Sequence, residues 1–244
     1  MPKLDIVYLL RDRPSKWANN ELRFSLRALE QYFPHGKVFV VSESLPEWAR
    51  NIGHIPAVDG YENKLMNATS KLRAACRHPD LSERFVLMND DFFFLRPTPR
   101  IETCTIGTLE KMIADHKTQA GYYFAAAKAT RDLLQASGID RPKAYEAHYP
   151  MVFEKQKFLA ATDAIAWDTH GYLFRSIYGN TYALGGKARP DTKAFSAGGF
   201  EKHEDFLSIS ESVALYPRFQ KFIFDKFPMA SQYETIESAP AKLP

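Results

Sequence analysis

The first 43 residues have the order strand, helix, strand, and this order constrains the fold more than any other feature of the sequence. KLDIVYLLR (3–11) and KVFVVSE (37–43) are short apolar, β-branched runs typical of buried strands. Between them, from Asn19 to Phe33, apolar residues recur three and four apart, which is typical of an amphipathic helix. Strands joined by a helix pair in parallel, so the sequence predicts a βαβ unit.

The same alternation continues to about residue 100. The segment 46–62 predicts a loop or short helix followed by a short strand, 63–79 predicts a helix, and SERFVLMNDD (82–91) predicts another strand. We therefore expect an open, Rossmann-like α/β sheet of the nucleotide-sugar transferase kind, in which ligands bind beyond the carboxyl ends of the strands.

The C-terminal half is predicted to be helical and rich in loops. Helical spacing occurs in 105–119, 128–138 and 211–227, a loop around Pro150 is expected to become a helix, and FLSISES (206–212) predicts a short strand. We find no internal repeat or linker, which predicts a single domain over 1–232 and a flexible tail over 233–244.

Composition narrows the class of protein. The net charge of +3 is too small to favour a dedicated nucleic-acid surface, so nucleic acid is a disfavoured partner. The isolated cysteines, Cys76 and Cys104, lack metal-ligand spacing and are expected to stay reduced. The sequence shows no secretory signal and no apolar run near ~18 residues, which predicts a cytoplasmic protein without integral membrane contact.

The stretch LMNDDFFF (87–94) places Asp90 and Asp91 at the end of a predicted buried strand. Carboxylates there can bind Mg²⁺ or Mn²⁺, since hard cations in nucleotide enzymes often take one or two carboxylates plus substrate phosphates. The alternative is a strand-end turn in which the carboxylates accept hydrogen bonds from backbone N–H groups.

Basic residues and a histidine supply further candidates. Arg11 follows the first strand, while Arg23 and Arg27 share one helical face and could bind phosphate oxygens. Their alternative is a solvated helix face with Glu21 and Glu30 as partners. His148, in a loop after Glu146, is a candidate general base or a structural hydrogen-bonding residue. The motifs of P-loop proteins, zinc hydrolases and serine hydrolases are missing from the sequence.

Four blocks taken together resemble the Stealth family. NNELRFSLRALEQYFP with KVFVVSESLPEWA and LSERFVLMNDDFFFLRP resembles its second region, DIVYLLR its first, AHYPMVFEK its third and FLSISES its fourth. The chain departs from the family at MNATSKLRAA (66–75) and at Ser210-Glu211, where the family pattern has Asn-Asp. That family includes capsular-polysaccharide phosphotransferases and the lysosomal-enzyme GlcNAc-1-phosphotransferase.

The resemblance implies roles for individual residues. It implies catalytic roles for Asp90, Asp91, His148, Arg175 and Glu211, with the aspartates as metal ligands. It implies a donor pocket that includes Arg11, Asn20, Glu21, Arg23, Arg27, Asn67 and Ser70.

The activity implied is transfer of a hexose-1-phosphate from a UDP-sugar to an acceptor hydroxyl, with release of UMP. A metal-dependent GT-A-like glycosyltransferase that releases UDP, with a glycan, protein or modified DNA as acceptor, is the second hypothesis. The third is a non-catalytic sugar- or nucleic-acid-binding protein that uses exposed aromatics such as Tyr122, Tyr123 and Phe124.

Overall fold

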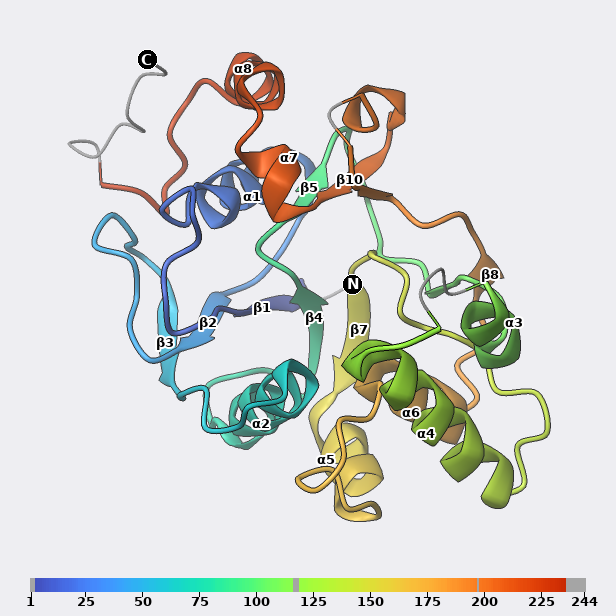
Figure 1. The fold of residues 1–244 in the computed structure, drawn as a ribbon. Helices are drawn as coiled ribbons and strands as arrows, with labels where there is room; N and C mark the ends of the chain where they lie inside the picture. Colours follow the sequence, from blue (N-terminus) through green and yellow to red (C-terminus); the bar gives the residue numbers. More distant parts are fainter. Residues whose placement is uncertain (1–2, 116–118, 197, 236–244) are drawn as a thin grey trace.

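A five-stranded sheet forms the centre of the protein (Figure 1). The computed structural model describes residues 3–115, 119–196 and 198–235. The strand order is β3-β2-β1-β4-β7, with β1 (Asp5–Leu9), β2 (Val38–Ser42), β3 (Gly53–Pro56), β4 (Arg84–Met88) and β7 (Met151–Glu154). The first four strands run parallel, and β7 joins β4 antiparallel. The prediction of an open Rossmann-like α/β sheet is confirmed.

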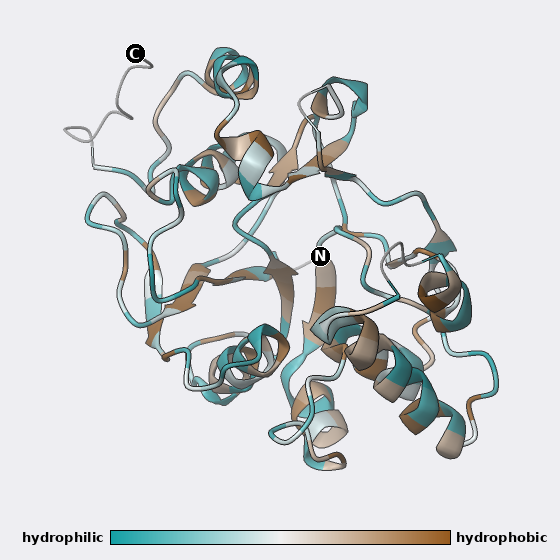
Figure 2. Cartoon of the chain, in the orientation of Figure 1, coloured by the Kyte–Doolittle hydropathy of each residue, from teal (hydrophilic) through white to brown (hydrophobic). Residues whose placement is uncertain are grey.

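Helices cover both faces of this sheet. Helix α1 (Asn20–Tyr32) packs Leu22, Leu26 and Leu29 against one face. Helices α2 (Lys64–Arg77), α5 (Lys155–Asp163) and α6 (Phe174–Thr181) cover the other face, as Figure 1 shows. Strands buried on both sides need apolar residues throughout, and Figure 2 shows hydrophobic colour along β1, β2 and β4.

A smaller sheet lies beside the first. The chain leaves β4 at Met88, crosses Asn89–Asp91 and enters β5 (Phe92–Phe94), which pairs with β10 (Phe206–Ile209) and through it with β9 (Lys193–Ala194). Phe92 and Phe94 face the core of the central sheet, whereas Phe93 faces a separate core with α8 (Pro217–Lys226). The three consecutive phenylalanines therefore bind the two sheets together.

The remaining elements complete the C-terminal half. They are β6 (Cys104–Thr105), α3 (Leu109–Ala114), α4 (Tyr122–Ala136), β8 (Lys187–Ala188), the 3₁₀ turn η1 (Phe200–Lys202), α7 (Glu211–Ala214) and α8 (Pro217–Lys226). The prediction that the loop around Pro150 runs directly into a helix is wrong, because β7 intervenes. Its four residues alternate between buried and partly buried, which suits an edge strand.

The flexible tail predicted for 233–244 starts too early in the sequence, because residues 233–235 are packed against the rest of the protein. Tyr233 and Glu234 are buried, and the Thr235 N–H donates to Trp48 O over 2.9 Å. Arg27 donates from Nε to Glu234 Oε1 and from Nη2 to Oε2, both over 2.7 Å. Residues 233–235 are therefore anchored to α1, while 236–244 lie outside the described residues.

Within the described ranges, none of the helices combines the length and apolar character that a membrane crossing requires.

We predict that Glu234→Ala lowers the free energy of unfolding by about 3 kcal/mol, since it leaves the buried guanidinium groups of Arg23 and Arg27 without their carboxylate. Urea denaturation measures the change. Glu30→Ala is the control, because Glu30 is exposed and, among the described residues, accepts a hydrogen bond only from the Gln232 N–H at 3.2–3.3 Å. Equal effects of the two substitutions would contradict this account of the C-terminal anchor.

Candidate functional site

A cavity of about 290 Å³ lies beyond the carboxyl ends of β1 and β4, where the sheet type predicts a ligand. Its charged lining consists of five cations and five carboxylates: Arg11, Arg13, Lys64, Arg175 and Lys193, and Glu21, Asp90, Asp91, Glu146 and Glu211. His148 also lines it. The first strands, the start of α1, the start of α2 and β10 therefore all contribute to one site.

Asp91 lies where the two sheets meet. Its Oδ2 accepts from Lys193 Nζ at 2.6 Å and from Ser208 Oγ at 3.4 Å. Its Oδ1 is buried and has no hydrogen-bond partner within the described part of the chain. A buried carboxylate oxygen without a partner is unfavourable, so this atom is suited to a ligand.

Asp90 is held close to other carboxylates. Burial, followed by the charges of Asp91 and Glu21, raises the pKa of Asp90 from 3.8 to about 7. Burial also raises the pKa of Glu21, although Ser15 Oγ donates to its Oε2 over 2.6 Å. Such a carboxylate group is stabilised when a cation binds beside it.

His148 forms a dyad with Asp191. The His148 Nδ1 lies 2.7 Å from Asp191 Oδ2, and the His148 backbone N–H donates to Asp191 Oδ1 over 2.9 Å. Partial burial alone would raise the pKa of Asp191, but the hydrogen bond and charge of His148 hold it below its usual value. An ionised Asp191 only accepts, so Nδ1 carries the proton and Nε2 remains the basic nitrogen.

Arg175, on α6, forms a buried positive charge in the cavity wall. Its Nη1 donates to Tyr149 O over 2.8 Å and its Nη2 to Asn89 Oδ1 over 3.2 Å. Burial lowers its pKa, and Glu146 opposes that shift. The arginine thus links the segment of His148 to the segment of Asp90 and Asp91.

Glu211 is the first residue of α7 and lines the cavity. It belongs to FLSISES (206–212), the block that resembles the fourth region of the family. Its Oε2 lies 3.5 Å from Lys16 Nζ, and its side chain is 44% exposed. It is therefore a carboxylate that a ligand can reach, rather than a buried structural group.

Five of the seven proposed donor-binding residues are not among the residues that line the cavity: Asn20, Arg23, Arg27, Asn67 and Ser70. Arg23 and Arg27 are buried and pair with Glu234. They therefore neither reach this cavity to bind phosphate nor form a solvated helix face, which were the two alternatives that the sequence offered. Asn67 accepts from Tyr61 N and donates to Tyr61 O, which fixes the loop before α2. Ser70 also lies outside the lining.

Asn20 lies beside the cavity rather than in its lining, as the first residue of α1. The preceding Asn19 does line the cavity, but its side chain accepts from Ser15 N over 2.9 Å instead of capping the helix.

Sequence reasoning missed Lys64, Lys193 and Asp191. Lys193 lies 102 residues from its partner Asp91, and Asp191 lies 43 residues from His148. Both come from the short stretch around β9, whose parallel addition to β10 has no local sequence signal.

The aromatic cluster at the start of α4 gives little support to a stacking surface. Tyr122 is exposed, whereas Tyr123 and Phe124 are partly buried and pack against a hydrophobic cluster between α3, α4 and α6.

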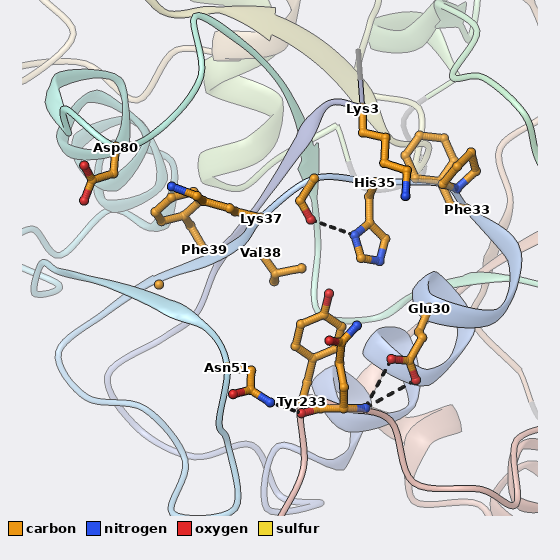
Figure 3. A pocket seen from close by; sticks show the side chains of 14 residues that line it. Lys3, Glu30, Phe33, His35, Lys37, Val38, Phe39, Asn51, Asp80 and Tyr233 are labelled. Atoms are coloured by element: carbon orange, nitrogen blue, oxygen red, sulfur yellow. Dashed lines mark hydrogen bonds between the residues drawn. The ribbon is translucent and has the colours of Figure 1, made fainter. Parts of the chain in front are cut away.

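A second cavity, of about 610 Å³, lies at the opposite edge of the sheet (Figure 3). Lys3, Lys37, Gly53 and Asp80 line it at or just before the amino ends of the strands, together with Tyr233. It contains none of the residues predicted to be catalytic, donor-binding or metal-binding, so the cavity beside Asp90 is the candidate site.

Comparison with known sequences confirms the resemblance seen in the sequence. The chain is 31% identical over 111 residues to the exopolysaccharide phosphotransferase CpsY of Mycobacterium leprae, a Stealth-family phosphotransferase. The match covers 42% of this chain but only 20% of that relative. No family model matches the sequence.

Comparison with solved structures agrees with the observed fold. The galactosyltransferase LgtC in complex with donor and acceptor sugar analogs has a TM-score of 0.50 at 10% identity, covering 94% of this chain and 98% of LgtC. An active-site mutant of LgtC gives a TM-score of 0.52 at 11% identity with the same coverage. The chain therefore has the GT-A fold, a Rossmann-like α/β fold.

We predict that Asp90→Asn stabilises the protein more at pH 8 than at pH 5 when divalent ions are removed. Because the pKa of Asp90 is raised on folding, the native state holds a proton that the unfolded state releases, and stability falls as pH rises from about 4 to about 7. Asparagine has no proton to release and therefore removes this fall in stability. Urea denaturation of wild type and variant at both pH values measures the free energy of unfolding.

The control is Asp115→Asn, since Asp115 is exposed and pairs only with Lys111 in the described structure. A stabilisation by Asp90→Asn that is the same at pH 5 and pH 8 would show that Asp90 titrates normally in the native protein.

Proposed function

We propose that this chain is a metal-assisted transferase of nucleotide sugars that moves a hexose-1-phosphate from a UDP-sugar to an acceptor hydroxyl and releases UMP. The observation that carries the proposal is the cavity beyond the carboxyl ends of β1 and β4, in which Asp90 and Asp91 lie among five cations. The resemblance to a phosphotransferase favours transfer of the sugar phosphate over transfer of the sugar alone.

The carboxylates fit a divalent cation. Asp91 Oδ1 is buried and unpaired in the described structure, and Asp90 carries a pKa raised by burial and by its acidic neighbours. Among the described residues, no group of three or more histidine, cysteine or acidic side chains is arranged around one ion position. A pair of aspartates suits Mg²⁺ or Mn²⁺, which bind through one or two carboxylates and substrate phosphates.

Asp90 and Asp91 would hold the ion, which when bound supplies positive charge against the phosphates of the donor. The lining sets five cationic side chains against five acidic ones. Because a nucleotide sugar and a divalent ion carry opposite charges, a lining of both signs would suit the pair.

His148 would act as the general base. Its Nε2 takes the proton of the acceptor hydroxyl, and Asp191 stabilises the imidazolium that forms through the 2.7 Å contact at Nδ1. The acceptor oxygen attacks the β-phosphorus of the donor. A bond forms between acceptor oxygen and phosphorus, while the bond from that phosphorus to the bridging oxygen breaks and UMP leaves.

Cations of the cavity would stabilise the charge on the phosphoryl group. Arg175 is fixed by two hydrogen bonds, so it needs little reorganisation when the donor binds. Arg11 and Arg13 are exposed on the loop after β1 and can fork onto diphosphate oxygens. Lys193 is already paired with Asp91.

The second candidate is a glycosyltransferase that releases UDP. The likeness of the fold to the galactosyltransferase LgtC favours it. The same carboxylates and cations would serve, but the acceptor would attack the anomeric carbon. The nucleotide released separates the two activities.

We predict that the purified protein, given Mg²⁺ or Mn²⁺, UDP-sugars and an acceptor glycan, releases UMP, and that Asp91→Ala and His148→Ala each lower the rate by at least about a hundredfold. Chromatography of the released nucleotide measures the activity. His170→Ala, a change at an exposed histidine outside the cavity, is the control.

UDP in place of UMP would establish glycosyl transfer. Wild-type protein that releases neither nucleotide from any donor of the panel would contradict a transferase.

We predict that Asp191→Asn lowers kcat by roughly a hundredfold while KM for the donor changes less than about threefold. Asparagine leaves a side chain of similar shape but removes the charge that stabilises the protonated His148. Steady-state kinetics measure both constants. A rise in KM with unchanged kcat would place the dyad in donor binding instead of base catalysis.

A further inference from the structure

We propose that Lys71 is a positioning residue that holds together the two loops which carry Arg11, Arg13 and Lys64 into the cavity. The inference rests on the proposed function, because it assigns these cations to the diphosphate of the donor.

Lys71 is a buried lysine of α2 with a fully occupied ammonium group. Only 2% of its surface is exposed. Its Nζ donates to Leu10 O over 2.8 Å and lies 2.8 Å from Asp12 Oδ1 and 2.7 Å from Asp59 Oδ1. An ammonium has three hydrogens, so each has an acceptor.

The two aspartates also join the loops directly. The Asp59 N–H donates to Asp12 Oδ2 over 2.6 Å, and the Asp12 N–H donates to Asp59 Oδ2 over 3.2 Å. With Lys71 between them, the loop after β1 and the loop before α2 form one unit.

This unit ends at the cavity. Arg11 lies between Leu10 and Asp12, both of which Lys71 contacts, and Arg13 follows directly. The second loop leads to Lys64 at the start of α2. Arg11, Arg13 and Lys64 line the cavity, whereas Lys71 does not.

Packing alone does not require a charge at this position. Burying an ion group is costly, and an apolar side chain of similar volume often stabilises a fold as well or better. Two neighbouring arginines on an irregular loop, in contrast, repel one another and bind a diphosphate tightly only when their backbone is fixed beforehand.

The chain offers a matched control in Lys155. This lysine is also buried, at 9% exposure, and its Nζ donates to His78 O over 2.7 Å and to Leu81 O over 2.9 Å. Its acceptors lie between α2 and β4, near the amino edge of the sheet. If the loss of any buried lysine weakened pyrophosphate binding, Lys71→Met and Lys155→Met would weaken it equally. An effect of Lys71→Met alone is specific to the two loops.

The experiment compares wild type, Lys71→Met, Asp59→Asn and Lys155→Met. Titration calorimetry with inorganic pyrophosphate and Mg²⁺ measures Kd, and hydrogen exchange measures protection of 10–13 and 57–63. We expect Lys71→Met to raise Kd about tenfold and Asp59→Asn about threefold, with loss of protection in both loops. KM for the nucleotide sugar should rise with Kd while kcat changes less.

A Kd for Lys71→Met equal to that of wild type or of Lys155→Met overturns the proposal, and so does a wild type that does not bind pyrophosphate. If Lys71→Met does not fold, Asp59→Asn decides by the same criteria. Failure of the proposed function is separate, since it shows as the absence of nucleotide release from every donor.

Discussion

Strands β2, β1 and β4 run parallel and end at one edge of the central sheet, and the candidate site depends on this arrangement. Parallel pairing sends the loop after β1, which carries Arg11, and the turn after β4, which carries Asp90 and Asp91, to the same place. Helices on both faces then exclude water from the strands, so the edge is where polar side chains can gather. The site is thus a consequence of topology before it is a consequence of any single residue.

The turn after β4 fixes the acidic pair in space. On one side it continues a strand buried in the central sheet, and on the other it enters β5, whose phenylalanines pack into two different cores. Apolar burial on both sides of a turn of three residues leaves the carboxylates little freedom to move away from each other. Burial and the nearby charges of Asp91 and Glu21 raise the pKa of Asp90. The fold thus holds these carboxylates in an arrangement that is unfavourable when no cation lies beside them.

The spacing of apolar residues predicts the helices and strands of this structure. It does not predict side-chain contacts between segments that are distant in the sequence. The βαβ unit, α2 and β4 follow from apolar spacing, and the strand-end position places Asp90, Asp91 and Arg11 at the cavity. Arg23 and Arg27 share a helical face as predicted, yet that face is covered by the segment around Glu234, more than 200 residues away. No local pattern contains that contact, nor the pairing of Lys193 with Asp91 across 102 residues.

The pairing of Lys193 with Asp91 also bears on how the site handles charge. One oxygen of Asp91 is occupied by an ammonium group at 2.6 Å, and the other is buried without a partner in the described structure. In the proposed activity Asp91 would hold the ion through Oδ1 while Lys193 remains at Oδ2, and a phosphate that drew Lys193 away would leave Asp91 beside the ion instead of with an unpaired charge. In the proposed activity, donor and ion would then favour each other's binding, since each would compensate the group that the other uses. Under the proposed function, a site that sets five cations beside five acidic side chains would bind the complex of nucleotide and metal more tightly than either component.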